Sequence, residues 1–176
     1  MEIIKEKYTL REWQLTDVES LVKNANNIRV WRNMTDLFPH PYTEKDAEAF
    51  ILMNIEKKEQ DAFAIVINGK AVGNIWFERG KDVERFGAEI GYWLGKEYWG
   101  QNIGSDVMQT VRDYIFATTD IARLFARAFA YNPGSMRVLE KSGFTKFGVS
   151  HQSAIKEGKF VDMPYYELLK HHILPY

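Results

Sequence analysis

Residues Tyr98–Val107 read YWGQNIGSDV, a polar loop with two glycines that leads directly into an apolar-periodic segment. That segment, from about Gly104 to Thr118, is predicted as a helix because apolar side chains recur on one face at helical spacing: Val107, Met108, Val111, Tyr114 and Ile115. A helix N-terminus presents N–H groups without partners inside the helix and the positive end of the helix dipole. Gly100 and Gly104 give an anion room to approach the backbone, and Asn102 tolerates a positive φ. The loop indicates either an anion site or an ordinary helix start, and its spacing alone leaves both open.

The predicted helix 104–118 lies between two strand-like runs, residues 85–94 and 123–130. A strand–helix–strand order of this kind predicts that the two strands run parallel. Side chains alternate along 85–94, so opposite faces are expected to carry two sets: Ala88, Ile90, Tyr92 and Leu94 on one, and Glu89, Gly91 and Trp93 on the other.

The other elements predict a mixed α/β sheet with helices on both faces. Further strands are expected at 8–13, 62–67, 71–77, 144–155 and 160–169, with Asn68-Gly69 and Glu157-Gly158 as turns. One helix is expected to follow the capping box at Thr16–Glu19. A second is capped by Thr43, with Ala47, Phe50, Ile51 and Ile55 on one face. Asn132-Pro133 starts a third, which ends at Ser142-Gly143. No repeat or linker divides the chain, so residues 1–176 are predicted to form a single domain.

Composition excludes several classes of protein. The 176 residues include 45% hydrophobic side chains, no cysteine and a net charge of −1. Disulfides, thiolate zinc sites and a cysteine nucleophile are therefore excluded, and the composition fits a cytoplasmic location. No long apolar run predicts a membrane span or a secretory signal. Residues 121–176 carry eight Lys/Arg against four Asp/Glu. This positive excess indicates either a site for an anionic ligand or an ordinary fluctuation in composition. The overall charge gives no reason to expect direct nucleic-acid binding.

Three motifs in order resemble the GNAT superfamily of N-acetyltransferases, and in particular its ribosomal-protein N-terminal (Rim-type) branch. The stretch WGQNIGSDV resembles that branch's acyl-CoA loop, W-G-x-G-x-A/G-T/S-E/D-A, with Asn102 in place of the central glycine. The stretch AEIGYWL (88–94) resembles its fourth strand, and NPGSMRVLEKSGF (132–144) resembles its second signature. The resemblance implies a GNAT-like acyl-CoA N-acyltransferase fold, with a mostly antiparallel sheet and one splayed parallel strand pair.

The resemblance also implies acetyl-CoA as cosubstrate. Its pyrophosphate would lie on backbone amides of the loop: Gln101, Asn102, Ile103, Gly104 and Ser105. The pantetheine arm would run between strands 85–94 and 123–130, pairing with the backbone of Tyr92, Trp93 and Leu94. One N–H there would lie near the thioester oxygen. Asn132 would bond the arm from the other side. Arg137 and Lys141, one helical turn apart, either face the nucleotide phosphates or form a solvated helix face.

The catalytic residues follow from the need for a neutral amine and a protonated leaving thiolate. Glu89 is the first candidate for the base, directly or through water, and it matches the base position of a histone-acetylating branch. The alternative is a structural carboxylate paired with Arg85 or a lysine. Many superfamily members supply the acid from a tyrosine at the position of Leu139. Ser135 is the substitute expected here, or else a helix-capping serine, and Tyr131 is a third choice.

The acceptor is expected to be a primary amine, most plausibly at the N-terminus of a protein or peptide. Residues 29–42 and the turn at 150–162 would form the walls of its groove, with Asp36, Glu78 and Asp162 as candidates to hold a cationic amine. The four histidines, including His171 and His172, show no metal-ligand spacing, so no metal is expected. A small-amine acetyltransferase (polyamine, amino sugar or antibiotic) and a non-catalytic acyl-CoA-binding module stay open. A nucleotide-binding domain is disfavoured by the absence of its glycine motifs. Membrane partners are not expected, and the chain would be a monomer or homodimer.

Overall fold

The computed structural model describes residues 2–170. Three short 3-10 turns join the main elements: η1 (Leu15–Asp17), η2 (Asp82–Glu84) and η3 (Lys96–Tyr98). The strands and helices are, in chain order, β1 (Ile3–Ile4), β2 (Thr9–Arg11), α1 (Val18–Ala25), α2 (Ile28–Trp31), α3 (Glu44–Ile55), β3 (Ala62–Ile67), β4 (Lys70–Arg79), β5 (Gly87–Leu94), α4 (Ile103–Thr118), β6 (Arg123–Arg127), α5 (Pro133–Lys141), β7 (Thr145–Lys156) and β8 (Lys159–Leu169).

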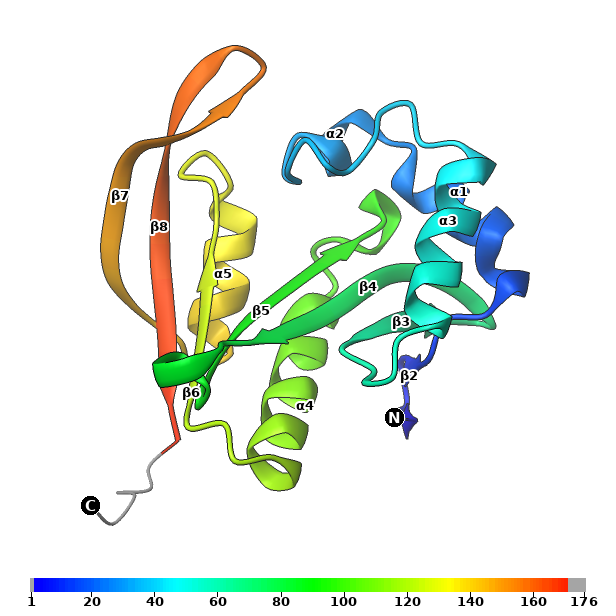
Figure 1. Ribbon diagram of the computed structural model, residues 1–176. Coiled ribbons are helices and arrows are strands. Elements are labelled where there is room, and N and C mark those ends of the chain that lie inside the picture. Colours follow the sequence, from blue (N-terminus) through cyan, green and yellow to red (C-terminus); the bar gives the residue numbers. More distant parts are fainter. Residues whose placement is uncertain (1, 171–176) are drawn as a thin grey trace. The chain divides into compact units, whose positions relative to one another are not determined.

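Within the described residues the strands form one sheet of order β1-β2-β3-β4-β5-β6-β8-β7. Figure 1 shows the long strands β7 and β8 side by side. Strands β5 and β6 are parallel, whereas the other described pairings are antiparallel. The parallel ladder stops at Glu89 and Phe125, although β6 continues through Arg127. The predicted α/β class, with a mixed sheet and one parallel pair that separates along its length, is confirmed.

The chain divides into two compact units, each made of two stretches of sequence. In the described part of the chain, unit 1 comprises residues 2–76 and Tyr92–Gly104, and unit 2 comprises Phe77–Gly91 and residues 105–170. Strands β4 and β5 and helix α4 therefore contribute residues to both units. The prediction of a single domain over 1–176 stays a prediction.

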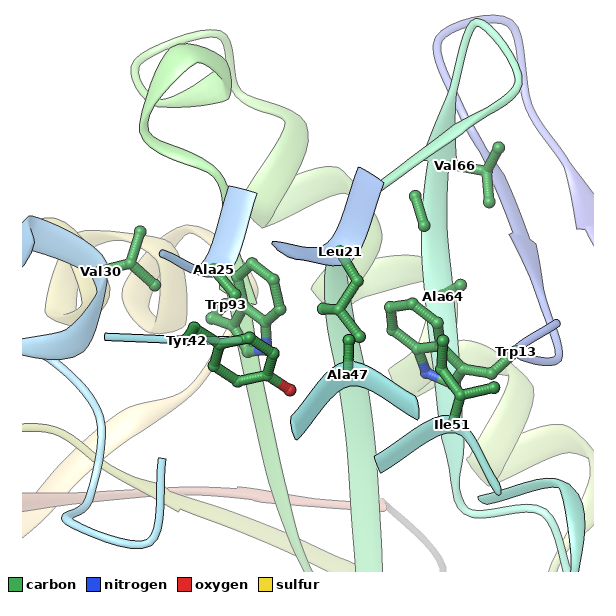
Figure 2. Packing of buried hydrophobic residues seen from close by; sticks show 11 residues of the cluster. Trp13, Leu21, Ala25, Val30, Tyr42, Ala47, Ile51, Ala64, Val66 and Trp93 are labelled. Atoms are coloured by element: carbon green, nitrogen blue, oxygen red, sulfur yellow. The ribbon is translucent and has the colours of Figure 1, made fainter. Parts of the chain in front are cut away.

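The core of unit 1 forms between helices α1 and α3 and the strands β3 and β4 (Figure 2). Leu21, Ala47 and Ile51 are fully buried there, at the helical spacing that the sequence predicts. Thr43 caps α3 as predicted, and the structure adds that it does so in a capping box with Asp46.

The capping box before α1 is formed by Gln14 and Asp17 and not by Thr16 and Glu19, because the chain first makes the 3-10 turn η1. Asp17 is also held by Arg11 through two hydrogen bonds of 2.7 Å. Ile55, expected on the buried face of α3, is 45% exposed at the helix end. Asn54 is buried in its place, where its amide donates to the backbone of the preceding helical turn.

Unit 2 contains α4 over most of its length, α5, and the strands β6, β8 and β7. The predicted apolar stripe of α4 is buried at Val107, Met108, Val111 and Ile115. The long β7–β8 hairpin turns at Glu157 and Gly158, which both have positive φ. In unit 1, Asn68 and Gly69 likewise have positive φ and join β3 to β4. Both predicted hairpin turns are therefore confirmed.

Candidate active site

The loop between β5 and α4 is tied back to the strand that precedes it. Trp99 donates from Nε1 to the backbone oxygen of Leu94 at 2.8 Å, and Gln101 donates from Nε2 to the oxygen of Glu97 at 2.8 Å. Gly100 has φ +75° and Asn102 has φ +61°, so Asn102 adopts the left-handed conformation predicted for it. This conformation directs the chain into α4, whose first residues supply the N–H groups of a helix N-terminus.

Gly104 lies against the aromatic ring of Tyr92. A side chain at position 104 would begin 3.0 Å from the ring edge and 3.3 Å from the hydroxyl oxygen of Tyr92. From the sequence, the expected reason for a glycine at this position is the room that it gives an approaching anion. The close approach of the Tyr92 ring is a second reason, which the sequence did not reveal. Both residues belong to the predicted cofactor-binding set, and the fold brings them together at the start of α4.

The end of β5 places side chains on both of its faces in apolar surroundings. Trp93 is 7% exposed and belongs to the core cluster of unit 1 (Figure 2), where the ring of Phe38 meets it edge-on. Leu94 is also buried. Because both side chains are used for packing, a ligand at this strand end would be recognised by backbone groups, as the resemblance implies for residues 92–94.

In unit 2 the first turn of α4 is joined to the last turn of α5. Ser142 donates from its hydroxyl to the backbone oxygen of Ser105, and Gln109 donates to the oxygen of Lys141 at 2.8 Å. The backbone of Lys141 therefore lies beside Gln109, in the second turn of α4, and the contact of its side chain with a phosphate stays a prediction. Arg137, one helical turn earlier, is exposed.

Asn132 caps α5. Its side-chain oxygen accepts a hydrogen bond from the backbone N–H of Ser135 at 3.1 Å. The Ser135 side chain is half-buried in the first turn of the helix. Leu139 is 2% exposed, so a side chain at this position points into the core of unit 2. The prediction that Asn132 caps this helix is confirmed. The roles of Asn132 and Ser135 towards a cofactor stay predictions.

Glu89 forms an ion pair with Arg127 across the parallel strands. The distances are 2.8 Å from Nε to Oε1 and 3.3 Å from Nη2 to Oε2, and the Glu89 side chain is only 18% exposed. Burial alone would lower the pKa of Arg127, but the charge of Glu89 and hydrogen bonds with Tyr165 and Glu89 raise it above its usual value. Arg127 therefore stays cationic beside the candidate base.

Arg127 is a residue of this site that the sequence did not reveal. The sequence predicts Arg85 or a lysine as the structural partner of Glu89, and this prediction is wrong. Arg85 lies over the ring of Phe86 and donates to the backbone of Asp82. The alternation of Arg123, Phe125 and Arg127 along β6 was visible. The register that brings Arg127 to Glu89 could not be predicted from the sequence, because it depends on where the parallel ladder stops.

The two segments expected to form walls of the acceptor groove belong to different units, residues 29–42 to unit 1 and the turn at 150–162 to unit 2. In unit 1, Trp31 stacks on His40 with ring centroids 5.6 Å apart, and Leu37 is 95% exposed. In unit 2, Asp162 accepts from the Gln152 N–H at 2.8 Å and pairs with His151 at 2.9 Å. These two contacts lower the pKa of Asp162 below its usual value, in that order of importance.

Asp162 is thus already paired with an imidazole, while Glu78 is exposed on β4 and Asp36 is exposed in the α2–α3 connection. Their proposed contact with a cationic amine stays a prediction. His171 and His172 lie outside the described residues. Among residues 2–170, no group of three or more metal-ligating side chains is close enough to hold a metal ion. No helix in the same range has the length and apolar character needed to cross a bilayer.

Comparison with known proteins identifies the family. The chain is 27% identical to the uncharacterised N-acetyltransferase p20 of Bacillus licheniformis over 94% of both chains. It is 25% identical to the ribosomal-protein-serine acetyltransferase of Escherichia coli, over 70% of this chain and 68% of that one. Its fold matches RimL, a ribosomal L7/L12 alpha-N-protein acetyltransferase solved with coenzyme A, with a TM-score of 0.84 at 21% identity over 96% and 98% of the two chains.

Residues 7–145 match the acetyltransferase (GNAT) domain family. The family match covers the loop, the strand β5 and the α5 signature together, and the likeness to Rim-type acetyltransferases extends over most of the chain. The protein therefore belongs to the GNAT family and is an acetyl-CoA-dependent N-acetyltransferase.

Proposed function

We propose that this enzyme acetylates the N-terminal amine of a protein or peptide. The observation that supports the proposal is the relation to the ribosomal-protein-serine acetyltransferase of Escherichia coli, whose named acceptor is a ribosomal protein. The three Rim-type motifs of the sequence agree with this choice. An acceptor of this kind would be met in the cytoplasm.

The proposed reaction is direct transfer. Loop amides from Gln101 to Ser105 bind the pyrophosphate, with Lys141 and Arg137 as cationic neighbours. The amine nitrogen attacks the thioester carbonyl carbon, the new C–N bond forms and the C–S bond breaks. A backbone N–H at the end of β5 stabilises the negative charge that develops on the carbonyl oxygen.

Two proton transfers accompany the reaction. Glu89 accepts the proton that the amine must lose, directly or through a water molecule, while Arg127 keeps the carboxylate in place. Coenzyme A leaves as a thiolate, which Ser135 or solvent protonates. A thiol of this type ionises near pH 8.5, so its protonation near neutral pH makes little demand on the enzyme.

The deciding experiment measures thiol release from acetyl-CoA with matched panels of amines. One panel contains peptides with free N-termini and the same peptides with blocked N-termini. The other contains a polyamine, an amino sugar and an amino-acid amide. Release with free-N-terminal peptides, with mass spectrometry placing the acetyl group on the terminal nitrogen, supports the proposal. Higher kcat/KM for a small amine would replace it with small-amine acetylation. CoA binding without release for any amine would leave a binding module.

A further inference from the structure

The end of β5 is held in an unusual way by the neighbouring strand β4. The backbone of Trp93 and Leu94 passes so close over Gly73 that no side chain fits there. A Cβ atom at position 73 would overlap the backbone oxygen of Trp93, lie 2.9 Å from Cδ2 of Leu94 and lie 3.1 Å from its Cα. Ordinary strand pairing leaves room for a Cβ, so this approach is a specific feature of these residues.

The next residue along the chain is held equally closely. Gly95 donates its N–H to the backbone oxygen of Val72 at 2.7 Å, and a Cβ on Gly95 would overlap the side-chain oxygen of Asn24. Asn24 is itself fixed, because its amide donates to the oxygen of Ser20 at 2.8 Å and to that of Ala71 at 3.3 Å. Helix α1 therefore restrains the position at which the loop leaves β5.

The peptide group between Trp93 and Leu94 is restrained in direction as well as in place. A trans peptide is planar, and its C=O and N–H point in opposite directions. Because the Trp93 oxygen rests on Gly73, the Leu94 N–H points away from Gly73. The Trp93 side chain, buried with Phe38, restricts rotation further. The bond from Trp99 to the Leu94 oxygen fixes the following peptide group, between Leu94 and Gly95.

We infer that Gly73 is a positioning residue for acetyl transfer: its bare Cα fixes the peptide group whose N–H faces the thioester. The inference rests on the proposed function, in which backbone groups of residues 92–94 contact the acyl-pantetheine arm. Gly73 touches no reacting atom. It acts through the position of the Trp93–Leu94 peptide, while the pyrophosphate contacts of residues 101–105 are made farther along the chain.

The principal test is Gly73→Ala, compared with Gly148→Ala as matched control. A Cβ at Gly148, on β7, meets no atom within 4 Å. Gly73→Ala is expected to lower kcat by about 100-fold, since a displacement on the order of 1 Å costs about that much. The Kd for coenzyme A, measured by calorimetry, is expected to stay within about threefold of wild type. The amide resonance of Leu94 should shift in the variant, and Gly148→Ala should resemble wild type in all three measurements.

A second pair of variants covers the case in which Gly73→Ala does not fold. Gly95→Ala is expected to lower kcat through its contact with Asn24, and Asn24→Ala should restore part of the loss by removing the overlapping oxygen. Adding Leu94→Ala to Gly73→Ala is expected to restore nothing, because the overlap with the Trp93 oxygen remains.

The results separate the two proposals. If wild type acetylates an amine and Gly73→Ala retains its kcat, or if Gly95→Ala shows no rescue by Asn24→Ala, the positioning role is wrong and the function stands. A large rise in the Kd for coenzyme A with unchanged kcat would also overturn it. If wild type acetylates no amine, the proposed function fails, and an unshifted Leu94 resonance in Gly73→Ala would then count against the positioning independently.

Discussion

At the residue scale, Glu89 on β5 has a matched control on β8, at the other side of β6. Glu89 pairs with Arg127, and Glu167 on β8 pairs with Arg123 at 2.7 Å. Both carboxylates belong to one row of the sheet, since Phe125 is the register partner of each. The two ion pairs are of the same kind, and they differ in that only the Glu89 carboxylate is proposed to accept the proton of the amine.

We expect Glu89→Gln to lower kcat by about 10²–10⁴-fold, the usual contribution of a general base. The loss should shrink as the pH rises, because more of the amine is then already neutral. Glu167→Gln removes the same charge from the same face and should leave kcat within a few-fold of wild type. The measurement is kcat against pH, with coenzyme A affinity as a check on folding. Equal effects of the two variants would reduce Glu89 to a structural partner of Arg127.

Ser135 should matter far less than Glu89. The cap of α5 uses the backbone N–H of Ser135 and the side chain of Asn132, so Ser135→Ala leaves it intact. Loss of one hydrogen bond to the thiolate is worth about 0.5–1.5 kcal/mol, or at most roughly tenfold in kcat. A thousandfold loss in single-turnover kinetics, with coenzyme A affinity unchanged, would make Ser135 the essential acid. Leu139→Tyr offers no rescue, because Leu139 is buried and the larger ring would overpack the core.

At the scale of elements, local signals in the sequence predicted most of the fold. Capping residues, the 3.6-residue apolar period and Asn-Gly turns are short-range features, and Thr43, α4 and the β3–β4 turn followed them. The errors arose where distant contacts decide. Asn54 replaces Ile55 in the core, and Arg127 replaces Arg85 beside Glu89, because tertiary packing and strand register are set by residues far away in the sequence.

The loop from Trp99 to Gly104 shows the same division. Its positive φ at Asn102 could be predicted from residue type, but the ring of Tyr92 over Gly104 could not. We expect Gly104→Glu to abolish measurable coenzyme A binding, since it adds bulk against Tyr92 and a negative charge near the phosphates. Gly148→Glu adds the same charge where a Cβ meets no neighbour, so it is the control. Calorimetry with coenzyme A checks both, and retained affinity in a folded Gly104→Glu protein would contradict the loop assignment.

At the scale of the whole molecule, the core of unit 1 links stability to the end of β5. Phe38 packs against both Tyr42 and Trp93, with ring centroids 4.9 Å and 5.6 Å apart, so loss of this core would release the strand end. Tyr42 is 4% exposed. Burial, and next the charge of Asp46, raise its pKa from 10.0 to about 12. Ionisation of Tyr42 is therefore coupled to unfolding of unit 1.

The sign of this coupling predicts alkaline instability. Tyr42 binds its proton more tightly in the folded state, so its contribution is fully present below pH 10 and is lost as the pH rises towards 12. The loss for this one group should be roughly 2 kcal/mol at pH 12. Tyr42→Phe, which cannot ionise, should flatten the dependence of the unfolding free energy on pH.

Burial and a hydrogen bond to Glu140 also raise the pKa of Tyr166, so part of the dependence will remain. Denaturant unfolding at intervals from pH 8 to pH 12, with Tyr131→Phe as an exposed control, measures the effect. Identical pH dependence in Tyr42→Phe and wild type would show that Tyr42 ionises without disturbing the core that supports β5.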